Sequence, residues 1–443
     1  MNGTRRITFA LLAILLAAAA CTELEPIAPT RVNTGSVDFA RFHAVGNSLT
    51  AGTQSNSLIE TRQVRSFPVL LAEAARAPKL EMPLISSPGI PNLLFFSQLL
   101  PTPVIDMLPG TGIETNTGFA GVFNNLGIPG AKVNDLRTKT ASDGGMYAIV
   151  LRNAALGSTA LIQAVNAAPT FTTVWIGAND IFNSASQGTD LLLTPTASFT
   201  TDFIAVMDSI TMASGTTVAA NVPGMLTIPF FATIPPVVVD PVTREPVLIG
   251  GNPVPLIGTS GNLSPDALVT LGASSFLAAG DGIPVILGGT GNPLPDFVVL
   301  TPAEKSNVLA RIDELNTVID TVCANRSVPV VDVHALLEEL DQNGVVIRDD
   351  TFNTDYVTGG LFSVDGIHPS SMGYWVITRE FARVINANFG AVIPEPPLPI
   401  EPVLNRVPGN NDEELLTPLH YALVLPYYAL TGFWRAFGVT GTH

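Results

Sequence analysis

Cysteine is almost absent from this sequence, since 443 residues contain only two, Cys21 and Cys323. A fold held together by several disulfides, as in small secreted domains, is therefore excluded. Cys323 falls on the apolar face of a helix predicted over residues 305–325, so we expect it in the core. Cys21 follows directly after a run of alanines and needs a separate explanation.

Charge is also scarce, and basic charge above all. Charged residues make up 13% of the chain, against about 25% in an average soluble protein. The formal net charge is −16, and no long run of lysine and arginine occurs. Nucleic acid is therefore not expected as a partner. Hydrophobic residues reach 47%, which indicates a globular chain with unusually uncharged loops.

The amino-terminal apolar run, residues 9–20, is too short to cross a bilayer, which needs about 20 residues. It follows Arg5 and Arg6, and this pattern predicts a signal peptide over residues 1–20. Three alanines before Cys21 resemble a bacterial lipobox, in which the cysteine thiol is lipidated. An ordinary cleavage site beside a cysteine is the alternative. We expect lipidation at Cys21, a lipid-anchored tether over residues 21–36 and export to the bacterial cell envelope, with Thr22 favouring the outer membrane.

Apolar strand-like runs alternate with helical patterns from residue 37 to residue 390. Strands with little polar alternation, separated by helices, predict a parallel sheet inside a three-layer α/β/α sandwich. Among these elements we expect strands over residues 39–45 and 119–126 and helices over residues 147–166 and 67–75, the latter with Ser66 as a candidate cap and Pro68 in its first turn. Residues 223–300 predict an insertion of short hairpins. Residues 391–443 form a Pro-rich linker and an apolar tail that we expect to dock on the body; a segment that lies on a membrane is the alternative.

Histidine is scarce as well, with five in the chain, and one of them has an acid at a suggestive distance. His368 lies in VDGIHPSSMGY, three residues after Asp365. On one tight loop, the Asp365 carboxylate can accept the Nδ1–H of His368 and leave Nε2 free to take a proton. A helix-capping turn is the alternative interpretation. Of the other histidines, His43 lies within a predicted strand and is expected to be a packing residue, and His334 is expected to be a surface or packing residue. His420 and His443 lie in the tail.

A nucleophile and oxyanion donors can also be found at the ends of predicted strands. Ser48 stands in AVGNSLTAG, where a strand ends and a helix begins, so it is a candidate nucleophile and also a candidate helix cap. Gly130, in NLGIPGAKVNDL, lets its backbone N–H approach a substrate closely. Asn179, in VWIGANDIF, has a side-chain amide that can donate to a developing oxyanion, as can the backbone N–H of Ser48.

The order and form of these four segments resemble the SGNH hydrolase superfamily, also called GDSL esterases and lipases. The resemblance implies the catalytic triad Ser48, His368 and Asp365 and an oxyanion hole made by Ser48, Gly130 and Asn179. It implies no metal and no cofactor. The chain departs from the family name at Asn47, where the family has aspartate. The acidic stretch over residues 348–355 is interpreted as a solvated loop, with a calcium site as the alternative.

The predicted function is that of a lipoprotein serine esterase or lipase that hydrolyses carboxylic esters through an acyl-enzyme. Its partners are then an ester substrate and, through Cys21, a membrane. Residues 91–110 are strongly apolar and predict a lip that binds an acyl chain, unless they pack as core. The alternatives are a carbohydrate O-acetyl esterase and a non-catalytic surface-binding lipoprotein on a hydrolase scaffold.

Overall fold

The computed structural model describes residues 31–98, 104–241 and 243–399. The chain divides into two units, residues 1–32 and 33–443, and the description that follows concerns the second. Within the described residues, no helix combines the length and the apolar character that crossing a bilayer requires.

A five-stranded parallel sheet forms the centre of the second unit. Its order is β13-β6-β5-β1-β4, and every neighbouring pair is parallel. The strands are β1 (Phe42–Gly46), β4 (Asn125–Gly127), β5 (Phe171–Trp175), β6 (Thr216–Ala220) and β13 (Val330–Val331). Strands β1 and β5 are buried along their whole length, because helices cover the sheet on both faces. The predicted α/β class with a parallel sheet is confirmed.

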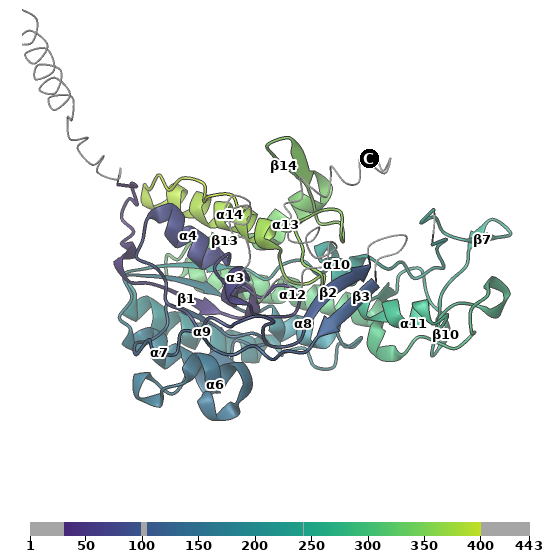
Figure 1. The fold of residues 1–443 in the computed structure, drawn as a ribbon, viewed down its shortest axis with the longest axis horizontal. Helices are drawn as coiled ribbons and strands as arrows, with labels where there is room; N and C mark the ends of the chain where they lie inside the picture. The colour runs from purple at the N-terminus through teal and green to yellow at the C-terminus, as the bar shows by residue number, and fades with distance from the viewer. Residues whose placement is uncertain (1–30, 99–103, 242, 400–443) are drawn as a thin grey trace, which may run out of the picture. The chain divides into compact units, whose positions relative to one another are not determined.

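Figure 1 shows the helices arranged in two layers around this sheet. Helices α4 (Phe67–Ala75) and α14 (Ser371–Phe389) pack together on one face. On the other face α9 (Thr196–Ala213) contacts both α7 (Ala160–Asn166) and α12 (Pro302–Ala324). The remaining helices are α2 (Ser48–Ala51), α3 (Glu60–Gln63), α5 (Asp135–Thr138), α6 (Gly145–Leu151), α8 (Asn179–Ala185), α10 (Pro229–Ala232), α11 (Ser274–Ala278) and α13 (Val333–Gln342).

Aromatic side chains join the sheet to the α4–α14 layer. The Phe67 ring stacks on Phe381 with the ring centroids 4.4 Å apart, and it meets Trp175 of β5 edge-on at 5.5 Å. All three side chains are almost completely buried. Burying a side chain of this size contributes roughly 1.5–3 kcal/mol, so this contact is a main attachment of α4 and α14 to the sheet. Cys323 is fully buried in α12, as predicted.

Short two-stranded ribbons form outside the central sheet. Three of them lie between residues 248 and 300, where the sequence predicts hairpins, and this region has an apolar cluster of its own that includes Leu256, Val269 and Leu294. The strands of these ribbons are β7 (Leu248–Ile249), β8 (Asn252–Pro253), β9 (Ile257–Gly258), β10 (Gly261–Asn262), β11 (Leu268–Val269) and β12 (Val299–Leu300). The others are β2 (Leu93–Gln98) with β3 (Val104–Leu108), and β14 (Val345–Ile347) with β15 (Asp350–Phe352). The limits predicted for the hydrolase domain, 37–390, stay a prediction.

Three predicted elements are wrong in extent. The strand expected over residues 39–45 begins only at Phe42, because residues 39–41 form a 3₁₀ helix that the Asp38 side chain caps. The strand expected over residues 119–126 is only β4, three residues long. The helix expected over residues 147–166 is broken between α6 and α7. The break has a local cause, because Gly157 adopts a positive φ of 140° and the side chain of Thr159 accepts a hydrogen bond that begins α7.

Candidate active site

The predicted site residues converge at the carboxyl edge of the sheet. Ser48 follows β1, Gly130 follows β4 and Asn179 follows β5. All three line one cavity of about 230 Å³, together with His368. Ligands of parallel sheets bind at this edge, because the loops after the strands meet there. Asp365 is not among the described residues that line the cavity. Its carboxylate contacts His368, which does line the cavity.

Ser48 is the first residue of α2, and this helix is capped by Asn47 rather than by Ser48, the predicted cap. The side chain of Asn47 accepts the backbone N–H of Leu49 at 3.0 Å, so Asn47 caps the helix. Ser48 is thereby left free of that role, and the prediction that Ser48 caps the helix is wrong. Ser48 is only 8% exposed, and its surface faces the cavity. No hydrogen bond joins Ser48 to His368 within the described structure. Such contacts often tighten only when substrate binds.

The Asp365–His368 pair has the geometry that the sequence predicts. His368 Nδ1 lies 2.7 Å from Asp365 Oδ2. The backbone N–H groups of Ile367 and His368 each donate to Asp365 Oδ1 at 2.9 Å. The carboxylate therefore orients the ring through Nδ1 and leaves Nε2 available on the cavity side.

The Asp365 carboxyl is buried and remains ionised. Burial alone would raise its pKa, but the charge of His368 and hydrogen bonds from His368 and Ile367 outweigh burial and lower the pKa to about 2. At neutral pH the side chain is therefore an anion that accepts hydrogen bonds only.

Gly130 and Asn179 lie on loops that are tied to each other. Gly130 has φ 82°, a left-handed conformation that favours glycine, and a Cβ there would meet nothing within 4 Å. The position is therefore open towards the cavity. Asn179 is the first residue of α8, and its Nδ2 donates to the carbonyl of Ala131 at 3.0 Å. An amide nitrogen has two hydrogens, so this bond fixes Asn179 and leaves one hydrogen for a ligand.

Asp180 is a buried acid beside Asn179 that the sequence did not single out. Its Oδ2 accepts the backbone N–H of Val133 at 3.0 Å, which holds the Gly130 loop against α8. No donor among the described residues reaches its Oδ1. Burial raises the pKa of Asp180 to about 6, against the hydrogen bonds from Val133 and Thr194 that lower it.

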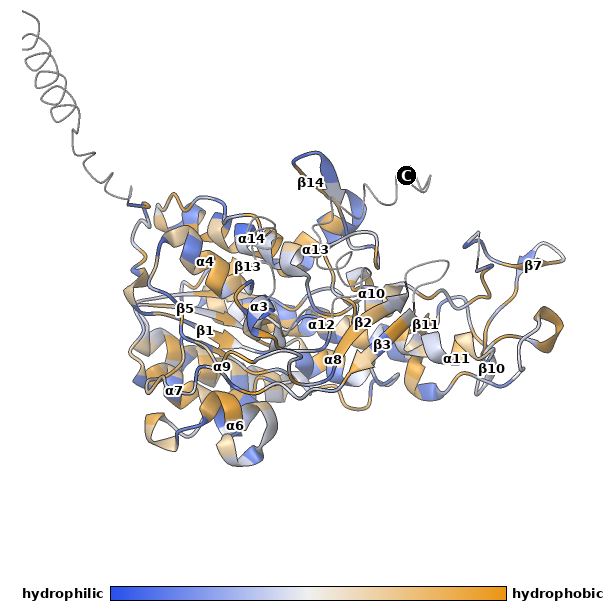
Figure 2. Ribbon diagram, in the orientation of Figure 1, coloured by the Kyte–Doolittle hydropathy of each residue, from blue (hydrophilic) through white to orange (hydrophobic). Residues whose placement is uncertain are grey.

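Apolar side chains form much of the cavity wall, but few come from the segment predicted to be an acyl lip. Residues 93–98 and 104–108 form the β2–β3 ribbon, which is largely hydrophobic in Figure 2. Of the described residues in the 91–110 segment, only Pro91 lines the cavity. The apolar wall instead includes Phe182, Ile228, Leu337, Phe362 and Ile367.

Comparison with protein families decides what kind of protein this is. The family model of GDSL-like lipases and acylhydrolases matches residues 43–381, most of the chain. The chain belongs to this family. This GDSL-like protein is therefore a carboxylic ester hydrolase. A search of curated proteins finds no match.

Solved structures similar to this GDSL-like hydrolase include a lipase/acylhydrolase from Enterococcus faecalis, which is 14% identical. That match covers 80% of this chain and 97% of the other, with a TM-score of 0.32. Another is the acetylxylan esterase Axe2 from Geobacillus stearothermophilus, which is 11% identical. It covers 78% of this chain and 93% of the other, with a TM-score of 0.34.

The other titratable residues of this GDSL-like hydrolase form no second centre in the described part of the chain. His43 is buried in β1, as predicted for a packing residue. His334 opens α13, where Asn316 and Glu338 are its partners. No group of three or more His, Cys, Asp or Glu residues in the described ranges is placed to hold a metal ion. Cys21, His420 and His443 lie outside the described residues.

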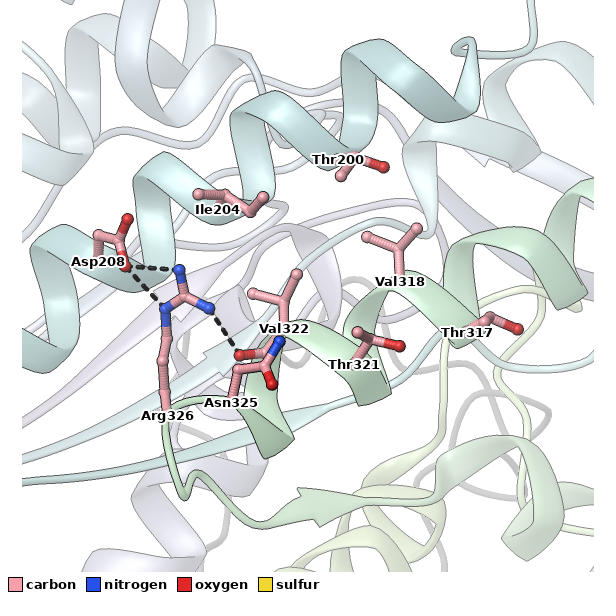
Figure 3. A pocket seen from close by; sticks show the side chains of 9 residues that line it. All are labelled: Thr200, Ile204, Asp208, Thr317, Val318, Thr321, Val322, Asn325 and Arg326. Atoms are coloured by element: carbon pink, nitrogen blue, oxygen red, sulfur yellow. Dashed lines mark hydrogen bonds and ion pairs between the residues drawn. The ribbon is translucent and has the colours of Figure 1, made fainter.

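A second hollow lies between α9 and α12 (Figure 3). Its one cation, Arg326, is already held by Asp208, with nitrogen–oxygen distances of 2.6 and 2.8 Å, and by the carbonyl of Val322. The hollow contains none of the predicted site residues. The chemistry predicted from the sequence therefore belongs to the cavity at the end of the sheet.

Proposed function

We propose that this hydrolase is an exported, lipid-anchored serine esterase with Ser48 as nucleophile, His368 as base and Asp365 as the residue that orients the base. The observation that carries the proposal is the 2.7 Å contact between His368 and Asp365, on the wall of the cavity that Ser48 also lines. A serine hydroxyl is a weak nucleophile unless a base takes its proton, and His368, oriented by Asp365, is that base.

The reaction proceeds in two halves. Ser48 Oγ attacks the ester carbonyl while His368 Nε2 takes its proton, and the backbone N–H groups of Ser48 and Gly130 with the Asn179 amide bind the oxyanion. His368 then protonates the leaving alcohol, and an acyl-enzyme remains on Ser48. A water molecule then attacks the acyl carbonyl and gives a proton to His368, which returns that proton to Ser48 Oγ as the carboxylic acid leaves. Each oxyanion donor contributes roughly 3–4 kcal/mol to lowering the barrier.

The wall of the cavity favours an acyl group longer than acetyl as the substrate. Apolar side chains such as Phe182, Ile228 and Phe362 line it, and burying each further CH₂ of a substrate there contributes about 0.8 kcal/mol. The second candidate is an acetylated glycan, the kind of substrate named for the acetylxylan esterase from Geobacillus stearothermophilus. Asn183 and Ser186, which also line the cavity, support it because amides and hydroxyls suit sugar hydroxyls.

A series of p-nitrophenyl esters with increasing acyl length separates these substrates. An acyl-binding wall predicts that kcat/KM rises from acetate to medium-chain esters. A strict preference for acetate would refute the lipid-ester proposal and leave the glycan deacetylase. The purified domain is then assayed on lipid esters and on acetylated glycans.

Labelling with a fluorophosphonate probe tests the nucleophile. The wild-type protein should be labelled and should lose its activity, because the probe phosphorylates an activated serine. Ser48→Ala should be neither labelled nor active. Thr50→Ala, two residues further along α2 and fully buried, is the matched control for losing a hydroxyl in this helix. Hydrolysis at the wild-type rate by Ser48→Ala would show that another residue is the nucleophile.

The anchor is proposed from the sequence alone, because Cys21 lies outside the described residues. Detergent-phase partitioning of the full chain and of Cys21→Ser tests it. We expect the wild-type protein in the detergent phase and the variant in the aqueous phase. Equal partitioning of the two proteins would exclude lipidation at Cys21 without affecting the catalytic proposal.

A further inference from the structure

A tight turn lies between the nucleophile and the Asp365–His368 pair. The backbones of Gln54 and Ser57 exchange two hydrogen bonds of 3.1 Å each, and the central residues Ser55 and Asn56 have φ of 54° and 64°. Positive φ at both central positions is the mark of a type I′ turn, which normally selects Asn-Gly. Neither central residue here is glycine, so the turn is held in a conformation that its own sequence disfavours.

Both central N–H groups of this turn point to the loop that carries the pair. Asn56 N–H donates to Asp365 Oδ2 at 2.6 Å, and Ser55 N–H donates to the hydroxyl of Ser363 at 2.8 Å. Ser363 Oγ lies 3.1 Å from Asp365 Oδ1. It also lies 3.0 Å from the carbonyl of His368, so two acceptors compete for the single hydroxyl proton. The ionised carboxylate is the stronger acceptor of the two.

The same short segment carries the proposed nucleophile. Ser48 begins α2, and the N–H groups of Gly52 and Thr53 close that helix onto the carbonyl of Ser48. Gln54 follows at once. Ser48 and the donors to Asp365 therefore belong to one hydrogen-bonded run of about ten residues, whereas Asp365 is more than three hundred residues away in sequence.

We propose that the Gln54–Ser57 turn and Ser363 are a positioning element that fixes Asp365, and through it the His368 ring, relative to Ser48. Ser363 is the positioning residue, because its hydroxyl accepts from the turn and donates to the carboxylate. This inference rests on the proposed function. It assigns no contact with substrate to Ser363, which does not line the cavity.

Other titratable groups also face Asp365, and they bear on any pH experiment. Three groups interact with the charge of Asp365: Arg62 of α3, Tyr356, which lies between β15 and α14, and Tyr374 of α14. Burial lowers the pKa of Arg62 to about 10, and burial raises the pKa of both tyrosines further above their ordinary value. None of the three changes its charge between about pH 5 and pH 8. Asp180, beside Asn179, has a pKa raised to about 6 by burial and does change its charge in that range. The profiles are therefore compared in an Asp180→Asn background, where the acidic limb reports on the Asp365–His368 pair.

The test is Ser363→Ala, with Ser363→Thr as the matched control that keeps the hydroxyl. We expect Ser363→Ala to lower kcat about ten-fold, the effect of one hydrogen bond to a charged group, with KM within two-fold of wild type. We also expect the acidic limb of the kcat/KM profile to move to higher pH, since a carboxylate with fewer donors holds the imidazole proton more tightly. Ser363→Thr should restore both values.

A second variant and a spectroscopic measurement keep the test independent of folding. Ser363→Cys retains the size of the side chain but donates weakly, and should give intermediate values. The downfield proton resonance of the His368 Nδ1–H, assigned by its loss in His368→Ala, should shift in Ser363→Ala. A wild-type kcat, pH limb and resonance in Ser363→Ala and Ser363→Cys would overturn the proposal. Full activity in Ser48→Ala would instead overturn the proposed function, so the two failures are distinguishable.

Discussion

Replacing Asp180 by asparagine removes a charge that the fold buries beside the proposed oxyanion loop. Asp180 is 1% exposed, and no described donor reaches its Oδ1. An asparagine keeps an oxygen to accept the Val133 N–H and replaces the unpaired oxygen by an NH₂ group. The variant therefore retains the contact that fixes the Gly130 loop and loses only the ionisation.

The size and sign of the effect follow from the pKa of Asp180. The pKa is raised from 3.8 to about 6 on folding, which corresponds to about 3 kcal/mol at about 1.4 kcal/mol per pKa unit. Because the folded pKa is the higher one, the stabilisation from the bound proton is fully present below about pH 4 and is lost by about pH 6. The asparagine side chain of the variant does not ionise and has no such loss. The unfolding free energy of Asp180→Asn minus that of the wild type should therefore increase by about 3 kcal/mol as the pH rises from 4 to 7.

Urea unfolding at several pH values measures this difference. The fluorescence of buried Trp175 and Trp375 reports the transition. Asp313→Asn, on the exposed face of α12, is the matched control for removing a carboxylate. A difference between Asp180→Asn and wild type that is the same at pH 4 and pH 7 would refute the reasoning, since no ionisation would then be linked to folding.

Three further predictions concern single residues. Gly130→Ala should lower kcat at least ten-fold and cost about 1–2 kcal/mol in stability, because alanine disfavours φ 82° and displaces a proposed oxyanion donor; steady-state kinetics and thermal melting measure the two effects. Cys323 should resist iodoacetamide at pH 8 until the chain is denatured, because burial raises the pKa of its thiol to about 12; mass spectrometry counts the adducts. Phe67→Ala should cost about 3–5 kcal/mol by leaving a cavity against Phe381 and Trp175; a urea midpoint within error of wild type would contradict this.

The predicted elements that proved accurate are those where sequence pattern and packing agree. Helix α4 has the predicted bounds, Phe67–Ala75, because apolar and alanine residues fill it and Pro68 fits its first turn. The prediction of one helix over residues 147–166 is wrong, because the spacing of apolar residues does not reveal a break such as the one at Gly157. Ser66 occupies the N-cap position of α4, but the prediction that its side chain caps the helix is wrong, because it makes no capping hydrogen bond.

The residues of the candidate site could also be predicted from the sequence only in part. Ser48, Gly130, Asn179 and His368 could be selected because the four segments that contain them together resemble one hydrolase superfamily, whereas each residue taken alone has an ordinary structural role as its alternative. Their catalytic roles stay predictions, although they share one cavity. Ser363 could not be selected, because a serine on a loop carries no signal until the fold brings the Ser55 N–H to it across 308 positions. Asp180 was missed because its importance comes from burial, which a single sequence does not report.

The start and the end of the described body are hydrogen-bonded to each other. Val392 N–H donates to the carbonyl of Asn33 at 2.7 Å, and Ser36 N–H donates to the carbonyl of Phe389 at 3.0 Å. A bridge of a few residues between these neighbouring ends would make the body a closed ring. Such a ring could be reopened at an exposed loop, for example near Gly250, to give a circular permutant with the same fold and the same cavity.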